Sequence, residues 1–103
     1  ILGDYYGAIS DFNKAIELNP KSANVYLNRG TAKSKVKDYS GAIVDYNKAI
    51  EIFPYDFKAY INRGLAKYKV GDMKGFCSDG KKVLSLGYEL DIKSEMMMLE
   101  NCQ

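Results

Sequence analysis

Apolar residues along this chain are spaced three and four positions apart, which is the spacing of one face of an α-helix. The segment 39–53 is the clearest case. It follows Asp38, whose side-chain oxygen can cap free N–H groups, and it ends before Pro54, which cannot continue a helix. We therefore expect a helix there, and a partner helix over residues 23–37. The apolar face of the clearer helix contains Ala42, Ile43, Tyr46, Ala49, Ile50 and Phe53.

This helical pattern recurs along the chain at a fixed interval. The stretch YLNRGTAKSKV begins at Tyr26, and a near copy, YINRGLAKYKV, begins at Tyr60. The two prolines, Pro20 and Pro54, are separated by the same interval. A unit of two helices that recurs at this interval therefore accounts for residues 1 to about 90. Counting back places the first residue inside an earlier unit, which indicates that the chain is a fragment that begins within a repeat.

The repeat predicts six helices and no strands. We expect one unpaired second helix, two complete helix pairs and a last helix after Tyr88, where the repeating pattern stops. An aspartate recurs in the short turn before each second helix, at a position suited to an N-cap. These aspartates are Asp4, Asp38 and Asp72.

This unit resembles the tetratricopeptide repeat (TPR), a helix–turn–helix of about 34 residues with the pattern W-x2-L-G-x2-Y, then A-x3-F, then P. Small residues let the paired helices approach closely, and a large ring fills the space beside them. The matching positions are Gly30 and Gly64, Ala8 and Ala42, Phe12 and Tyr46, and Pro20 and Pro54.

The chain also departs from the family pattern. In the third unit Phe76 stands at the small position and Gly80 at the large one, so we expect the ring to fill the volume that the glycine vacates. The other departures are Tyr26 and Tyr60 for Trp, Arg29 and Arg63 for Leu, and Lys33 and Lys67 for the second aromatic residue.

The resemblance implies an all-α, right-handed solenoid with about two full repeats, a half repeat and a capping helix. The final helix should cover the last pair with Leu90, Met97 and Met98, as terminal repeats require; the alternative is a Met-rich surface for a partner. The expected parts of this one TPR domain are 1–20 (second helix of a truncated repeat), 23–56 and 57–88 (repeats), and 89–103 (capping helix).

Composition removes several classes of function. The 15 Lys and Arg nearly balance the 13 Asp and Glu, so nucleic acid is not an expected partner, and no apolar run is long enough for a membrane span. The chain has no histidine and only two cysteines, so we expect no catalytic residue, no metal and no cofactor. We expect Cys77 to pack inside the third helix pair and Cys102 to be a free thiol. Few cysteines argue against an extracellular disulfide framework and favour the cytoplasm, although the compartment stays open.

In TPR proteins the first helices line an inner, concave wall that usually binds an extended peptide or a segment of a partner protein. The resemblance carries this role to one set of residues in each complete unit. In the second unit these are Asn24, Leu27, Asn28, Thr31, Ser34 and Lys35, and in the third they are Lys58, Ile61, Asn62, Leu65, Tyr68 and Lys69.

Two features of that wall carry specific hypotheses. Asn28 and Asn62 offer a donor and an acceptor once per repeat, so they suit successive peptide units of a ligand; the alternative is bonding to neighbouring helices or water. The lysines Lys35, Lys58 and Lys69 resemble part of a clamp for a C-terminal carboxylate, although solvated lysines are the simpler interpretation for each.

Arginine and aspartate recur in phase with the repeat. Arg29 and Arg63 occupy an interior-facing position on first helices, where an unpaired charge is costly. We therefore expect ion pairs between helices rather than a ligand-binding role. The candidate partners are Asp11, Asp45 and Asp79.

The sequence thus favours a non-enzymatic scaffold that binds a protein or peptide. The alternative is a structural element that associates with further copies of itself through its N-terminal or C-terminal helix. The apolar face of the first helix lacks the first helix of its own unit, and a contiguous patch in water would promote such association. That face consists of Ala8, Ile9, Phe12 and Ile16.

Overall fold

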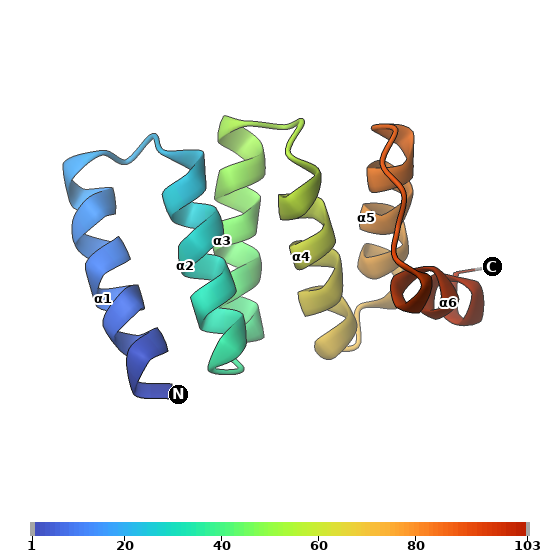
Figure 1. The fold of residues 1–103 in the computed structure, drawn as a ribbon, viewed down its shortest axis with the longest axis horizontal. Coiled ribbons are helices and arrows are strands. Elements are labelled where there is room, and N and C mark those ends of the chain that lie inside the picture. Colours follow the sequence, from blue (N-terminus) through green and yellow to red (C-terminus); the bar gives the residue numbers. More distant parts are fainter. Residues whose placement is uncertain (1, 103) are drawn as a thin grey trace.

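Five helices stand side by side in chain order, and a sixth lies across their end (Figure 1). The computed structural model describes residues 2–102, and this part of the chain contains no strand. Each helix packs against the next along the chain, as expected for stacked helix pairs. The fold is therefore the predicted all-α helical repeat. The helices are α1 (Leu2–Leu18), α2 (Ala23–Lys35), α3 (Tyr39–Ile52), α4 (Phe57–Lys69), α5 (Met73–Ser85) and α6 (Ile92–Asn101).

Aspartate caps start the second helices of the two complete pairs. The side chain of Asp38 accepts a hydrogen bond of 3.0 Å from the backbone N–H of Gly41, and Asp72 accepts one of 2.9 Å from Gly75. A side chain at either glycine would run into the capping carboxylate, so the glycine is part of the cap. Asp4 differs from the prediction, because α1 begins at Leu2 and places Asp4 in its first turn.

The core lies between the first and second helices of each pair. Gly30 lets α2 and α3 approach so closely that an added Cβ would lie 2.8 Å from a ring carbon of Tyr46, which is 1% exposed. Tyr26, which replaces the family's Trp, donates a 3.0 Å hydrogen bond from its hydroxyl to the carbonyl of Pro20. Tyr60 repeats the bond at 2.9 Å to Pro54. Each tyrosine thus fills the core and also anchors the preceding turn.

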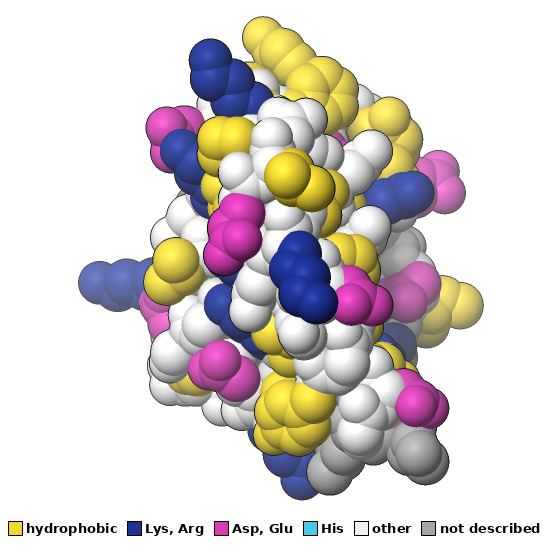
Figure 2. Space-filling model, turned by 90° about the vertical axis from the view of Figure 1, so that its left-hand side faces the viewer, with side chains coloured by type: hydrophobic (Ala, Val, Ile, Leu, Met, Phe, Trp, Pro, Cys, Tyr) yellow, Lys and Arg dark blue, Asp and Glu magenta, His cyan; other side chains and the backbone are white. Residues whose placement is uncertain are grey.

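The apolar face of α1 is partly covered, as the sequence suggested. Figure 2 shows hydrophobic side chains on the outward side of α1 in separate groups between charged and other polar side chains. Ile16 packs against the core. In this view the hydrophobic side chains do not merge into one patch (Figure 2). The four residues expected to be partly uncovered, all half-buried, are Ala8, Ile9, Phe12 and Ile16.

Helix α6 departs from the direction of the stack (Figure 1). It contacts α5 far less than the other neighbouring helices contact each other, and none of its residues is buried. The thioether of Met98 fills the volume beside Gly80, which corrects the expectation that Phe76 fills it. The Phe76 ring is buried and instead meets Tyr68 edge to face, with centroids 5.2 Å apart.

The two cysteines form a disulfide, contrary to the prediction of a packed Cys77 and a free Cys102. The physical reason is the path of α6, which turns back across α5 and brings the two Cα atoms to 5.5 Å, within the range that a disulfide spans. Their separation of 25 residues along the chain conceals this proximity.

None of the helices in residues 2–102 is both long enough and apolar enough to cross a membrane.

Candidate functional site

A groove of about 280 Å³ runs between the first helices of the two complete units. We call it the α2–α4 groove. Its walls come from α2 and α4, and two tyrosines of α3 contribute to its lining. It brings together residues predicted for the concave wall from both complete units. The lining consists of Thr31, Ser34, Lys35, Tyr39, Tyr46, Asn62, Leu65, Ala66 and Lys69.

Hydrogen bonds hold the polar groups of this groove in place. The Tyr46 hydroxyl donates to the Thr31 hydroxyl at 3.3 Å and lies 3.4 Å from that of Ser34. Asn62 donates from its side-chain nitrogen to Thr31 at 3.5 Å, at the long limit for a hydrogen bond. The amide of Asn62 therefore faces another first helix, and a stronger acceptor on a ligand can replace this weak bond.

Several of the predicted wall residues do not line the α2–α4 groove. Asn24, Asn28 and Lys58 are exposed on α2 and α4 but outside the groove. Leu27 is 8% exposed and belongs to the core cluster, so it is not an accessible ligand contact. Its burial follows from its place in the core cluster that also contains Tyr46 of α3 and against which Ile16 of α1 packs.

A second hollow adjoins the groove on the other side of α4. We call it the α4–α6 hollow; its lining consists of Leu65, Tyr68, Lys69, Lys93 and Met97. Leu65 and Lys69 line both spaces, so the two adjoin along α4, and we call them together the channel. Three lysines border this channel, and no Asp or Glu is among its lining residues. The channel therefore favours negative charge in an extended ligand.

Ile61 lies under α6 rather than in the open channel. It lines a small cavity of about 20 Å³ between α4, α5 and α6, together with Leu65 and with Leu90 of the segment that leads into α6. This volume holds at most a single water molecule, and the lining is almost entirely apolar. Ile61 is thus partly covered by the chain itself and is half-buried.

A ladder of charged residues supports the first helix behind the groove. Arg29 donates two hydrogen bonds to Asp45, from Nε at 2.9 Å and from Nη2 at 2.7 Å, and a third of 2.9 Å to Asn13. Lys33 approaches the same carboxylate at 3.2 Å. Asp45 is 1% exposed, so its charge is fully enclosed by these partners. The guanidinium thereby joins α1, α2 and α3.

The ladder repeats one unit later. Arg63 donates to Asp79 at 2.9 and 2.6 Å and to Asn47 at 3.0 Å, and Lys67 lies 3.4 Å from the carboxylate. These hydrogen bonds raise the pKa of both arginines above the ordinary value, with Asp45 acting on Arg29 and Asp79 on Arg63. Asp11, the third candidate partner, is exposed and makes no ion pair with an arginine of residues 2–102.

Comparisons with known proteins agree with this geometry. A TPR repeat model matches residues 1–36, and a tetratricopeptide repeat model matches residues 23–56. The second TPR of Spaghetti (RPAP3), solved with the HSP90 peptide SRMEEVD, is 30% identical with a TM-score of 0.79, over 82% of this chain and 78% of that one. The chain belongs to the tetratricopeptide-repeat family.

Other TPR structures are similar over most of this TPR chain. The Arabidopsis OM64 TPR domain is 26% identical with a TM-score of 0.87, and the match covers 95% of this chain and 83% of that one. The TPR2B domain of yeast Sti1, in its complex with pHsp70, is 26% identical with a TM-score of 0.79, covering 95% and 78%. No match was found among curated proteins.

Reasoning from the TPR pattern missed part of the channel. Tyr39 and Tyr46 belong to a second helix, which the concave-wall rule does not consider. Lys93 and Met97 belong to α6, whose crosswise path no repeat position encodes. The Met-rich composition of the last helix indicated a binding surface on that helix, but it did not indicate against which helices this surface would lie.

Proposed function

We propose that this chain is a peptide-binding scaffold whose channel holds an extended, acidic segment of a partner protein. The observation that carries the proposal is the set of three lysines along one channel with no acidic lining residue. Lys35 and Lys69 line the α2–α4 groove, Lys69 also lines the α4–α6 hollow, and Lys93 of α6 lines the hollow.

The polar groups of the channel suit a peptide backbone. Thr31 and Asn62 offer a hydroxyl and an amide in the α2–α4 groove, where they meet only through a 3.5 Å contact. Leu65 and Tyr68 add apolar surface for one or two ligand side chains. A ligand that pairs its carboxylates with the lysines can therefore lay its backbone across Thr31 and Asn62.

Similar structures support the same class of ligand. The TPR of Spaghetti was solved with SRMEEVD, a peptide with three acidic side chains, and TPR2B of Sti1 was solved in a complex with pHsp70. We transfer from them only the chemistry of an acidic peptide, because the partner of this chain is a separate question.

Fluorescence anisotropy with a labelled SRMEEVD peptide, used as a probe, tests the proposal. We expect saturable binding, and we expect Lys35→Ala and Lys69→Ala each to weaken it about fivefold, which corresponds to about 1 kcal/mol for a partly exposed charge contact. Lys58→Ala is the matched control, since Lys58 is an exposed lysine of α4 that lies outside the channel.

A second probe separates charge from sequence. The same peptide with its acidic residues replaced by their amides should bind more weakly by at least about tenfold. Equal affinity for the two peptides, or an equal loss in the Lys58→Ala control, would refute the proposed role of the channel.

Self-association is a second candidate function, and one observation favours it. Ile92, Met96 and Leu99 lie on one side of α6 at intervals of four and three residues, and they are 77%, 55% and 71% exposed. Two copies of this stripe can pair about a two-fold axis. Light scattering should then show a dimer that Met96→Glu dissociates. A monomer for the unchanged chain at about millimolar concentration, where even weak association is visible, would exclude this function.

A further inference from the structure

Helix α6 depends on few contacts for its position. It has 10 residues, none of them buried, and its contact with α5 is small. Isolated helices of this length are not stable in water, so α6 needs an attachment to remain folded. The chain attaches its N-terminal end through residues 86–91, and the disulfide from Cys77 of α5 to Cys102 attaches its C-terminal end.

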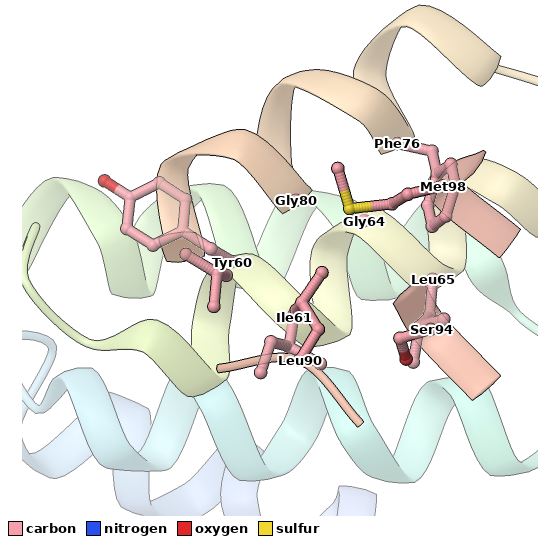
Figure 3. A pocket seen from close by; sticks show the side chains of 10 residues that line it. Tyr60, Ile61, Gly64, Leu65, Phe76, Gly80, Leu90, Ser94 and Met98 are labelled. Carbon is pink, nitrogen blue, oxygen red and sulfur yellow. The ribbon is translucent and has the colours of Figure 1, made fainter. Parts of the chain in front are cut away.

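The side chains beneath α6 form a loose seat. Figure 3 shows Met98 reaching between Gly80 and Gly64, with Leu90 beside Ile61. A cavity of about 20 Å³ remains between these groups, so the packing is incomplete. The contact of α6 with α5 is also much smaller than the contacts between successive helices from α1 to α5, so the seat alone holds α6 weakly.

The disulfide lies at the surface, where a reductant can reach it. Both cysteines line a hollow of about 380 Å³ between α5 and the end of α6, and both are half-buried. Lys74 and Lys81 line the same hollow. Their charge stabilises the thiolate that leaves when the bond is attacked, which favours reduction at this position.

We propose that the Cys77–Cys102 disulfide is a redox latch that holds α6 in place, so that a dithiol reductant releases α6 and dismantles one end of the channel. In the chemical step, one thiolate of the dithiol attacks a cysteine sulfur, the S–S bond breaks, and a mixed disulfide forms. The second thiol of the reductant then closes its own disulfide. Two electrons and two protons thus pass to the protein, which ends with two free thiols.

Release of α6 should weaken binding of an acidic peptide, because α6 contributes to the lining of the α4–α6 hollow; this inference rests on the proposed function. Lys93 and Met97 of α6 form one wall of this hollow, opposite Tyr68. When α6 is released, the channel loses one of its three lysines and one wall, while the α2–α4 groove stays intact. The oxidised chain therefore binds an acidic peptide more tightly than the reduced chain.

The experiment uses the full chain with and without dithiothreitol, and first counts free thiols. We expect none before reduction and two after it. Hydrogen exchange of the α6 amides should then accelerate at least about tenfold, while the α3 amides remain unchanged. The variant with Cys77→Ser and Cys102→Ser should show the fast exchange without reductant and no response to it.

Peptide affinity forms the second arm. Affinity for the SRMEEVD probe should fall about fivefold on reduction, and Lys93→Ala in the oxidised chain should reproduce at least part of that loss. Two free thiols before reduction, unchanged α6 exchange after it, or equal affinity in the two states would overturn the proposal. Absence of peptide binding in both states would instead refute the proposed function, while α6 exchange would still decide whether the disulfide is a latch.

Discussion

Replacing Arg63 by leucine tests how the charged ladder stabilises the fold. The guanidinium donates two hydrogen bonds of 2.9 and 2.6 Å to Asp79, which is 2% exposed. Arg63→Leu restores the usual family residue but leaves this carboxylate with only Lys67, at 3.4 Å. Breaking one side of a buried ion pair costs about 3–5 kcal/mol, and the remaining lysine places the expected loss near about 3 kcal/mol.

Urea unfolding followed by far-UV circular dichroism measures this loss. With a slope of about 2 kcal/mol per molar urea, the midpoint should fall by about 1.5 M. Lys48→Ala is the control for a pair in contact with solvent, because Lys48 and Glu51 lie 3.5 Å apart with side chains that are 42% and 71% exposed. It should change the unfolding free energy by less than about 0.5 kcal/mol.

The double variant Arg63→Leu with Asp79→Ala identifies the cause of the loss. If the stranded carboxylate is responsible, removing it should restore at least about half of the lost free energy. A double variant less stable than Arg63→Leu would show instead that Asp79 contributes through its packing. A single variant no less stable than Lys48→Ala would refute the reasoning altogether.

The remaining predictions concern other parts of the chain. Gly30→Ala should destabilise the fold by about 1–2 kcal/mol in urea unfolding, because overpacking against Tyr46 outweighs the gain in helix propensity. Gly7→Ala adds a Cβ with nothing within 4 Å, so it should stabilise the fold by about 0.5–1 kcal/mol. A destabilised Gly7→Ala would contradict this comparison. Asn62→Ala should weaken binding of the acidic probe about fivefold, whereas Asn28→Ala, outside the groove, should change it less than twofold; equal losses would restore the two-asparagine ladder. The hydrogen bonds from Ser94 lower the pKa of Asp91, so the ionised cap stabilises α6 above the pKa of the unfolded carboxyl, and this stability is lost as pH falls through the folded pKa. Hydrogen exchange of the α6 amides, corrected for intrinsic rates, should therefore accelerate below about pH 4 in the unchanged chain but not in Asp91→Asn.

The repeat made most of the fold predictable. Its period fixes where small, large and capping residues recur, and each such residue acts on neighbours within the same or the adjacent unit. Gly30 therefore meets Tyr46, and Arg63 meets Asp79, at positions that the period alone places on facing helices. Contacts of this kind can be predicted from the sequence because the same pair of residues recurs one period later.

The residues that form the α6 end of the channel do not recur with the repeat, so the sequence did not predict their contacts. The disulfide between Cys77 and Cys102 occurs once, and it depends on the path of a helix outside the repeat. The burial of Leu27 likewise depends on the tertiary packing of the core cluster, which the spacing of concave positions does not describe. One sequence cannot reveal contacts that occur only once, because nothing in its period distinguishes them from chance.

Two asparagines, Asn13 and Asn47, connect neighbouring repeat units through the arginines of the ladder. Asn13 and Asn47 each accept from the arginine of the next unit, so a tandem copy of residues 23–56 would supply both halves of every new junction. One period after Asn47 the chain has Lys81, a cation with no acceptor, and one period after Arg63 it has Met97. An arginine presented to α5 by a further unit would meet a like charge. Lys81 therefore makes the C-terminal side of α5 unlike the two junctions before it, where an asparagine accepts from an arginine.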